Sequence, residues 1–165
     1  MRWLLLAFVV LCGPSAPAAA GYGEGVRAYD AGRYDDALKE FLPLSERGDR
    51  DAEFMLGAMY FYGKGVPRDD SLAAAWFHKA ARQGHTGAQL AYGSLFVEGR
   101  GVLTDLVAAY MWLTVAAESS VPLIEQRALF LREFAAHSMT RDEIEEASRL
   151  ARGWQPIAAG LAAEP

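Results

Sequence analysis

AEFMLGAMYFYGKGVPRD, residues 52–69, returns 36 positions later as AQLAYGSLFVEGRGVLTD, residues 88–105. The agreement continues downstream, where residues 73–81 and 109–117 share alanines and a tryptophan at matching places. A period of this length is typical of stacked repeat proteins, whose units bury their apolar faces only against their neighbours. The product is an extended curved surface, which favours binding of another molecule over catalysis.

Each repeat is predicted to form two antiparallel helices, because apolar residues recur with a helical spacing on both sides of a glycine-rich turn. In the first copy this turn is 63–67, where two glycines can take positive φ and a proline cannot continue the first helix. Asp69 is then placed to cap the second helix. Gly57 and Gly93 lie inside the first helices, where glycine costs up to about 1 kcal/mol relative to alanine. We therefore expect a close helix approach at both glycines.

Both copies closely resemble the Sel1-like repeat. The first carries the pattern from Ala52 to the Gly-His junction at His85, whereas the second departs from it at Tyr92 and Leu103 and lacks the closing Gly-His. The resemblance implies an all-α, right-handed α/α superhelix similar to that of tetratricopeptide proteins. It also implies an adaptor or scaffold for other proteins, in signalling, envelope or host-interaction roles.

The chain is predicted to be a solenoid of about three to four antiparallel helix pairs. Upstream of the clear repeats, Ala37 and Phe41 fall 36 residues before Ala73 and Phe77, as in a shortened copy. Downstream the period decays, and a capping box at 140–143 signals a last helix. The predicted organisation is a signal peptide (1–20), a degenerate N-terminal helical pair (21–48), two Sel1-like repeats (49–84 and 85–120), a C-terminal capping helical pair (121–154) and a frayed tail (155–165).

The first twenty residues have the pattern of a secretory signal peptide, because Arg2 precedes an apolar run over 3–11 and small residues follow over 15–20. We expect cleavage after Ala20 and a periplasmic location, with no membrane insertion after cleavage. Lipidation of Cys12 is the alternative, which Leu11 disfavours because the bacterial lipoprotein signal has a small residue there. Cys12 is also the single cysteine, so the cleaved chain has no disulfide and no thiol nucleophile.

No catalytic residue, metal site or cofactor is predicted. The chain's three histidines, His78, His85 and His137, do not have the spacing of a zinc motif, and His85 sits at the repeat junction, where a structural role is favoured. The Gly-Lys-Gly turn at 63–65 lacks the spacing of a phosphate-binding loop. A net charge of −5 is unfavourable for binding nucleic acid. The predicted partner is a protein or peptide segment, as the resemblance implies.

The predicted binding surface is the concave groove, which the first helix of each pair lines in the related tetratricopeptide arrangement. Phe61 and Tyr62 are the main candidates, because large aromatic side chains anchor bound peptides. Phe54 and Phe61 have a second interpretation, in which they only pack against the neighbouring helices. The groove candidates are Asp51, Phe54, Phe61, Tyr62, Leu90, Ser94, Val97 and Glu98.

Two other functional classes remain open at the level of sequence. One is an envelope hydrolase or glycan-active enzyme, which only the compartment and scattered acidic residues favour. The other is a structural subunit that self-associates through the long C-terminal helix, where Leu123, Phe130 and Phe134 lie beyond the face expected to pack inward.

Overall fold

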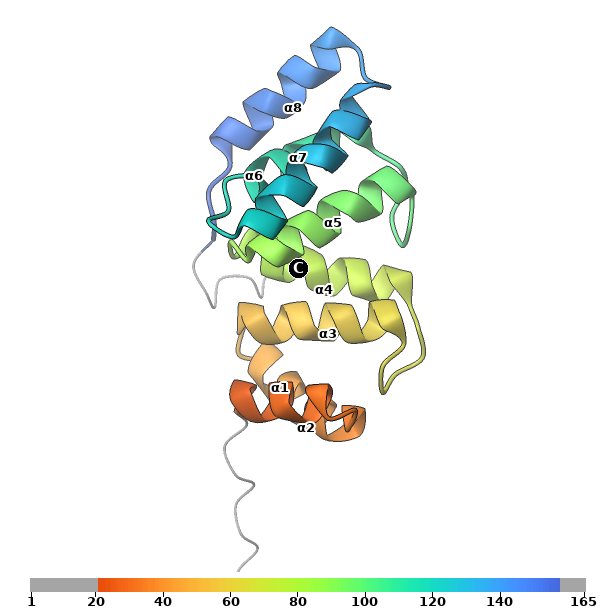
Figure 1. Ribbon diagram of the computed structural model, residues 1–165, viewed down its shortest axis with the longest axis vertical. Coiled ribbons are helices and arrows are strands. Elements are labelled where there is room, and N and C mark those ends of the chain that lie inside the picture. Colours follow the sequence, from red (N-terminus) through yellow and green to blue (C-terminus); the bar gives the residue numbers. More distant parts are fainter. Residues whose placement is uncertain (1–20, 158–165) are drawn as a thin grey trace, which may run out of the picture.

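The computed structural model describes residues 21–157, and within them the chain is a stack of eight helices with no strand (Figure 1). This is the expected all-α solenoid, and the prediction of fold class is confirmed. The helices are α1 (Tyr22–Asp30), α2 (Tyr34–Ser45), α3 (Arg50–Tyr62), α4 (Asp70–Arg82), α5 (Thr86–Glu98), α6 (Leu106–Ala116), α7 (Pro122–Ala136) and α8 (Arg141–Gly153).

The two clear repeats form α3–α4 and α5–α6, and their turns have the same backbone. Gly63 and Gly65 have φ of 65° and 73°, and Gly99 and Gly101 have φ of 66° and 69°. These are left-handed conformations, which glycine adopts without a steric penalty. After each turn an aspartate caps the second helix, since the Asp69 carboxylate accepts hydrogen bonds from the backbone N–H groups of its first turn.

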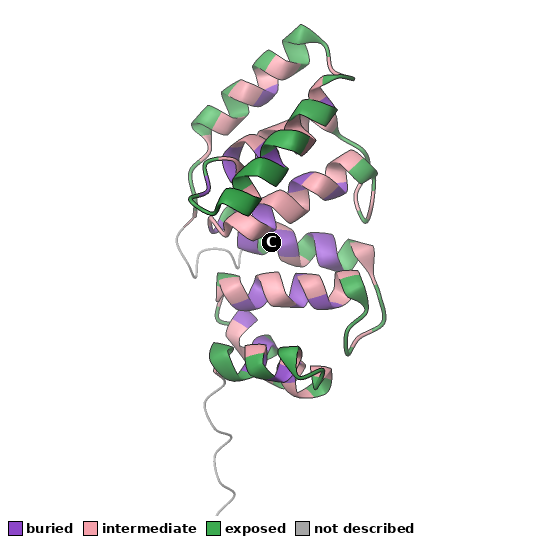
Figure 2. Cartoon of the chain, in the orientation of Figure 1, coloured by how far each residue is buried: buried purple, intermediate pink, exposed green. Residues whose placement is uncertain are grey.

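Glycines inside the first helices bring paired helices into close contact, as predicted. A Cβ added at Gly57 would lie 2.6 Å from the Phe77 ring, and one at Gly93 would lie 2.9 Å from Leu113. The upstream copy repeats this contact, because a Cβ at Gly25 would lie 2.5 Å from Phe41. Alanines fill the rest of these crossings and are fully buried (Figure 2).

The last two helices depart from the paired arrangement. α8 packs on α6, and α7 packs on α6 and α5, while α7 and α8 make little contact with each other (Figure 1). The sequence predicted a capping helical pair over 121–154, and both helices form, but each covers α6 separately. A capping box between Thr140 and Glu143 starts α8, as expected. Because α8 does not cover it, most of α7 remains exposed (Figure 2).

The chain turns back after α8 and contacts the first clear repeat. The Ile157 N–H donates a hydrogen bond of 2.9 Å to the Arg82 carbonyl, and the Trp154 ring lies edge-on to Trp112, with their centroids 6.0 Å apart. The expectation of a frayed tail from residue 155 is therefore wrong for residues 155–157, because the backbone finds a partner at the end of α4. The rest of that tail, 158–165, lies outside the described residues.

The expected signal peptide, its cleavage after Ala20 and the alternative of lipidation at Cys12 all fall outside the described residues. Among the helices of residues 21–157, none is long and apolar enough to cross a membrane.

Candidate functional site

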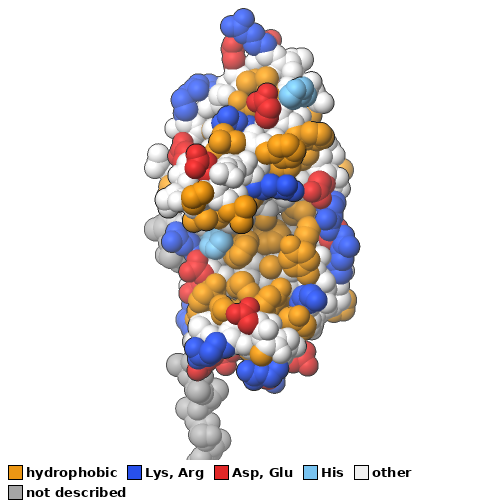
Figure 3. Space-filling view, viewed as in Figure 1, with side chains coloured by type: hydrophobic (Ala, Val, Ile, Leu, Met, Phe, Trp, Pro, Cys, Tyr) orange, Lys and Arg blue, Asp and Glu red, His pale blue; other side chains and the backbone are white. Residues whose placement is uncertain are grey.

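A pocket of about 250 Å³ opens where α3, α5 and α7 face one another. Apolar side chains gather in this hollow across the middle of the face shown in Figure 3. Its lining residues are Phe54, Ala58, Phe61, Tyr62, Phe77, Gly87, Leu90, Ala91, Ser94, Glu98, Arg127 and Leu131. We call this surface the groove pocket.

The structure brings most of the predicted binding residues to this one pocket. Six of them line it: Phe54, Phe61, Tyr62, Leu90, Ser94 and Glu98. Asp51 and Val97 are not part of the lining. Val97 instead packs against the hydrophobic cluster under α6 and α7, and Asp51 lies beside His85. The first helices of the two repeats therefore share a common surface.

Phe54 and Phe61 both pack internally and line the pocket, so their two interpretations are compatible. The Phe54 ring stacks on His85 at 4.3 Å between centroids and lies 5.7 Å from Phe77. Phe61 lies 6.3 Å from Phe77 and lies under the Arg100 guanidinium, whose central carbon is 4.2 Å from the ring centroid. Both side chains are half-buried and are therefore held in place on a surface that remains open.

The polar residues of the lining differ in how far their side chains already contact other residues of the chain. Tyr62 is 64% exposed, and its ring meets Phe61 edge-on at 5.0 Å. The Ser94 hydroxyl donates a hydrogen bond of 2.7 Å to the Ala91 carbonyl. The Glu98 carboxylate pairs with Arg100 at 3.3 Å. Tyr62 is thus the most available of the predicted groove side chains.

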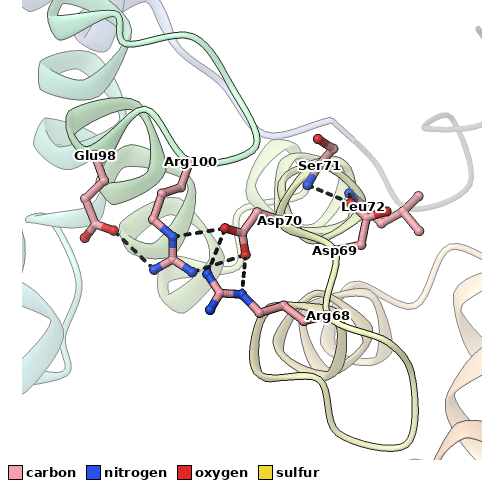
Figure 4. A network of polar contacts seen from close by, with 7 residues as sticks. All are labelled: Arg68, Asp69, Asp70, Ser71, Leu72, Glu98 and Arg100. Carbon is pink, nitrogen blue, oxygen red and sulfur yellow. Dashed lines mark hydrogen bonds and ion pairs between the residues drawn. The ribbon is translucent and has the colours of Figure 1, made fainter.

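A network of charges fixes the edge of the pocket beside Phe61 (Figure 4). Two nitrogens of the Arg100 guanidinium donate hydrogen bonds of 3.1 Å each to the Asp70 carboxylate, and Arg68 donates two more of 3.0 Å. Hydrogen bonds from Arg68 and Arg100 hold the pKa of Asp70 well below its usual range. Because Asp70 begins α4 and Arg100 follows α5, the network ties one repeat to the next.

His85 is used as a helix cap at the other end of the pocket. Its Nδ1 accepts a hydrogen bond of 3.0 Å from the Ala88 N–H, and its Nε2 lies 3.7 Å from Asp51. Burial lowers the pKa of His85, while the nearby Asp51 carboxylate opposes the shift. A neutral ring is the form that can accept this hydrogen bond and stack on Phe54.

The three histidines are not brought together. His78 stacks on Tyr92 at 5.0 Å between centroids, whereas the exposed His137 lies near its own helix carbonyl at Glu133. In the described part of the chain, no group of three His, Cys, Asp or Glu side chains has the arrangement needed to hold a metal ion.

The turns, capping aspartates and buried glycines of the two copies follow one family pattern. A family model described as the Sel1 repeat matches residues 50–85 and 86–121. This chain contains two Sel1 repeats. Their register agrees with the helices, since each matched segment begins at the first helix of a pair, α3 or α5.

Solved structures with the same fold include two bacterial proteins. One is a protective antigen of uropathogenic Escherichia coli displaying an SLR fold, with a TM-score of 0.73, 28% identity, and coverage of 84% of this chain and 30% of that one. The other is a Sel1 repeat protein from Oxalobacter formigenes, with a TM-score of 0.64, 26% identity, and coverage of 82% of this chain and 56% of that one.

A relative among characterised proteins is an exopolysaccharide production negative regulator of Rhizobium meliloti (strain 1021). It is 35% identical over 60 residues, which are 36% of this chain and 22% of that protein. The chain therefore matches only a minor part of this relative, and it spans about a third to a half of the solved structures above.

Sequence reasoning missed the wall of the pocket that α7 supplies. Arg127 and Leu131 lie outside the two Sel1 repeats, in a helix that we did not expect to line the groove. A signal was present, because the starts of α3, α5 and α7 are separated by 36 residues each. Arg127 accordingly falls 36 residues after Ala91, which also lines the pocket.

Proposed function

We propose that this chain is a non-enzymatic binding module that holds a segment of another protein in the groove pocket. The observation that carries the proposal is the pocket itself, an open apolar hollow whose aromatic side chains are held by packing and, at Phe61, by a cation–π contact with Arg100. Preorganised aromatic residues in a partly desolvated hollow are what anchors a bound segment. Sel1 repeats are usually protein-interaction modules, which supports the same conclusion.

The compartment and the pathway belong to the same proposal. The pattern of residues 1–20 supports export to the bacterial periplasm. A regulatory adaptor in the cell envelope fits the similarity to a negative regulator of exopolysaccharide production. Fractionation of cells expressing the full chain tests the location, and the mature protein is expected in the periplasmic fraction with Gly21 as its first residue. Recovery of the uncleaved chain in the cytoplasm would overturn this part.

The groove is tested by photocrosslinking in intact cells. A photoreactive phenylalanine at Tyr62 is expected to give a discrete adduct with a partner protein, because this side chain is exposed on the lining. The matched control carries the same group at Leu103, which is 90% exposed and lies outside the groove pocket. An Ala58→Arg change in the Tyr62 protein should abolish the adduct by filling the pocket. Identical adducts from both positions would show that the groove is not the binding site.

A further inference from the structure

We infer that the groove pocket selects a peptide segment in which a bulky apolar side chain lies next to an acidic residue. The apolar side chain fills the pocket, and the carboxylate pairs with Arg127 on α7. This inference rests on the proposed function and goes further, because it names the chemistry of the partner segment.

The size of the pocket limits what fills it. At about 250 Å³ it is smaller than the roughly 300–1,000 Å³ of sites that enclose a drug-sized ligand. Its walls are the apolar faces of Phe54, Phe61, Leu90 and Leu131. A single large apolar side chain, presented by a longer segment that runs over the open side, matches this volume and lining.

Arg127 supplies a positive charge that has no carboxylate partner within the described chain. Among the ion pairs of residues 21–157, none involves Arg127, so no carboxylate there lies within 4.0 Å of its guanidinium. The other charged residue of the lining is Glu98, whose carboxylate is neutralised by Arg100 at 3.3 Å. The unpaired charge of the lining is therefore the positive charge of Arg127, which is complementary to an acidic group.

Apolar surface flanks Arg127 on its other side as well. Leu123, Phe130 and Phe134 are 78%, 63% and 61% exposed, and their spacing places them on one face of α7 together with Arg127. We call these three residues the α7 stripe. The Arg127 guanidinium lies 5.9 Å from the Phe130 ring centroid. A segment that crosses from the pocket to the α7 stripe would exclude water around Arg127 and strengthen its pairing with a carboxylate.

A second copy of the chain is a less suitable occupant of the α7 stripe. A two-fold interface places the same surface of both subunits face to face. Arg127 lies between Leu123 and Phe130, near the centre of the stripe, so antiparallel pairing would bring two arginines close together. Like charges at an interface cost several kcal/mol. A peptide with an acidic residue removes this repulsion.

The test is selection of random peptides, displayed on phage, by the mature chain of residues 21–165. The expected consensus contains Leu, Ile, Phe or Trp next to Asp or Glu. For a synthetic peptide with that consensus, Arg127→Glu should weaken binding by about tenfold or more. Replacing the acidic residue by lysine should restore binding to the Arg127→Glu protein. The matched control is Arg47→Glu, which makes the same charge change at an exposed arginine outside the groove pocket and should bind within about twofold of wild type.

The outcomes separate this inference from the proposed function. A consensus without an acidic residue, or an equal loss in Arg47→Glu, would overturn the role of Arg127 while leaving the groove as a peptide site. Selection of no peptide by the wild-type chain would overturn the proposed function itself. Light scattering that shows a dimer, converted to a monomer by Phe130→Ser, would assign the α7 stripe to a second copy and overturn the inference.

Discussion

The two Sel1 repeats have turns of the same backbone conformation, but different side chains attach each turn to the preceding helix pair. At the first junction, the Lys64 ammonium lies 5.4 Å from the Tyr34 ring centroid. At the second, the equivalent Arg100 binds the Asp70 carboxylate through two nitrogens. The turn geometry is the same in both, because it depends on glycines with positive φ. The repeat thus determines how the backbone docks, while the side-chain chemistry at each junction varies.

One of the differences between the interiors of the two repeats involves an ionisable side chain. Gln89 of α5 donates a hydrogen bond of 3.2 Å to the Ala81 carbonyl, whereas its counterpart Glu53 in α3 accepts one of 2.7 Å from Gln83. Both side chains are buried. Burial raises the pKa of Glu53 to about 7 and Asp49 adds to the shift, although Lys79 and the Gln83 hydrogen bond oppose it. The first repeat therefore contains an ionisable group that the second lacks.

The largest loss of stability is expected when the second turn, 99–103, can no longer pack against the start of α4. A Cβ at Gly101 would lie 2.0 Å from the Asp70 carbonyl oxygen, whereas one at Gly65 would meet the Tyr34 side chain at 2.6 Å. Gly101→Ala should lower the free energy of unfolding by about 3 kcal/mol, and Gly65→Ala by less. Urea unfolding followed by circular dichroism measures both.

Gly32→Ala is the control for these glycine variants. Gly32 also has positive φ, but nothing lies within 4 Å of the position of its added Cβ. Gly32→Ala should therefore lower the free energy of unfolding only by the cost of a left-handed backbone conformation, about 1–2 kcal/mol. Equal losses of stability in all three variants would mean that the glycines are needed for their backbone conformation alone. Docking of the turns on the preceding helix pair would then contribute nothing.

The next effect is expected from Glu53→Gln, which gives the first repeat the glutamine that the second has at this position. The folded chain holds the Glu53 proton up to about pH 7, whereas the unfolded chain releases it near the ordinary pKa of 4.5. Wild-type stability should therefore fall as the pH rises from about 4.5 to 7 and then level off. The variant lacks this fall, so at pH 8 we expect it to be more stable than wild type by about 1–3 kcal/mol.

Thermal or urea unfolding between pH 4.5 and 8 measures this difference. Glu46→Gln is the matched control, because Glu46 is exposed and follows α2 nearby. The converse change, Gln89→Glu, should introduce a similar loss of stability toward high pH in the second repeat. A pH profile that Glu53→Gln leaves unchanged would contradict the raised pKa.

A smaller effect is expected from removing the charge at the second junction. Asp70→Asn should cost about 0.5–1 kcal/mol, because Arg68 and Arg100 lose their shared carboxylate on a partly exposed surface. The pKa of Asp70 is lowered in the folded chain, so this contribution is present at neutral pH and is lost as the pH falls below the ordinary value of 3.8.

Lys64→Ala tests the first junction in the same assay and should cost only a few tenths of a kcal/mol, since that contact is a single exposed cation–π pair. Salt distinguishes the two junctions further. The cost of Asp70→Asn should shrink in 1 M NaCl, because exposed ion pairs are screened. A loss that neither acid nor salt reduces would indicate that the charge of Asp70 does not account for its contribution to stability.

Local residues explain why most of the fold could be predicted. Turn glycines, capping aspartates and the helix-facing Gly57 and Gly93 act within one repeat, so their spacing alone predicts the helices and their close crossing. The lack of packing between α7 and α8 could not be predicted, because it depends on which surface of α6 each helix covers. The return of residues 155–157 to Arg82 is likewise a contact between distant parts of the chain.

The candidate site divides in the same way. The predicted residues on α3 and α5 were assigned to one surface by the resemblance to tetratricopeptide proteins, and most of them line the groove pocket. The sequence does not show whether such a side chain is exposed for binding. Val97 packs inward, for example, whereas Tyr62 stays exposed. Arg127 was missed because α7 has lost the glycines and capping residues that mark the earlier repeats, although it keeps their spacing.

The smallest effect is expected from a substitution that makes the second turn more like the first. Leu103 occupies the place of Pro67 and is 90% exposed, and among the described backbone hydrogen bonds of the turns none is donated by its N–H. Leu103→Pro should therefore stabilise the chain by about 0.5 kcal/mol, because proline restricts the unfolded state without removing a hydrogen bond. The urea midpoint should rise with an unchanged slope. Leu103→Ala controls for the loss of the exposed side chain and should leave the midpoint unchanged. If proline lowers the midpoint instead, the two turns differ in backbone conformation at this position, and the shared geometry of the repeats is confined to their glycines.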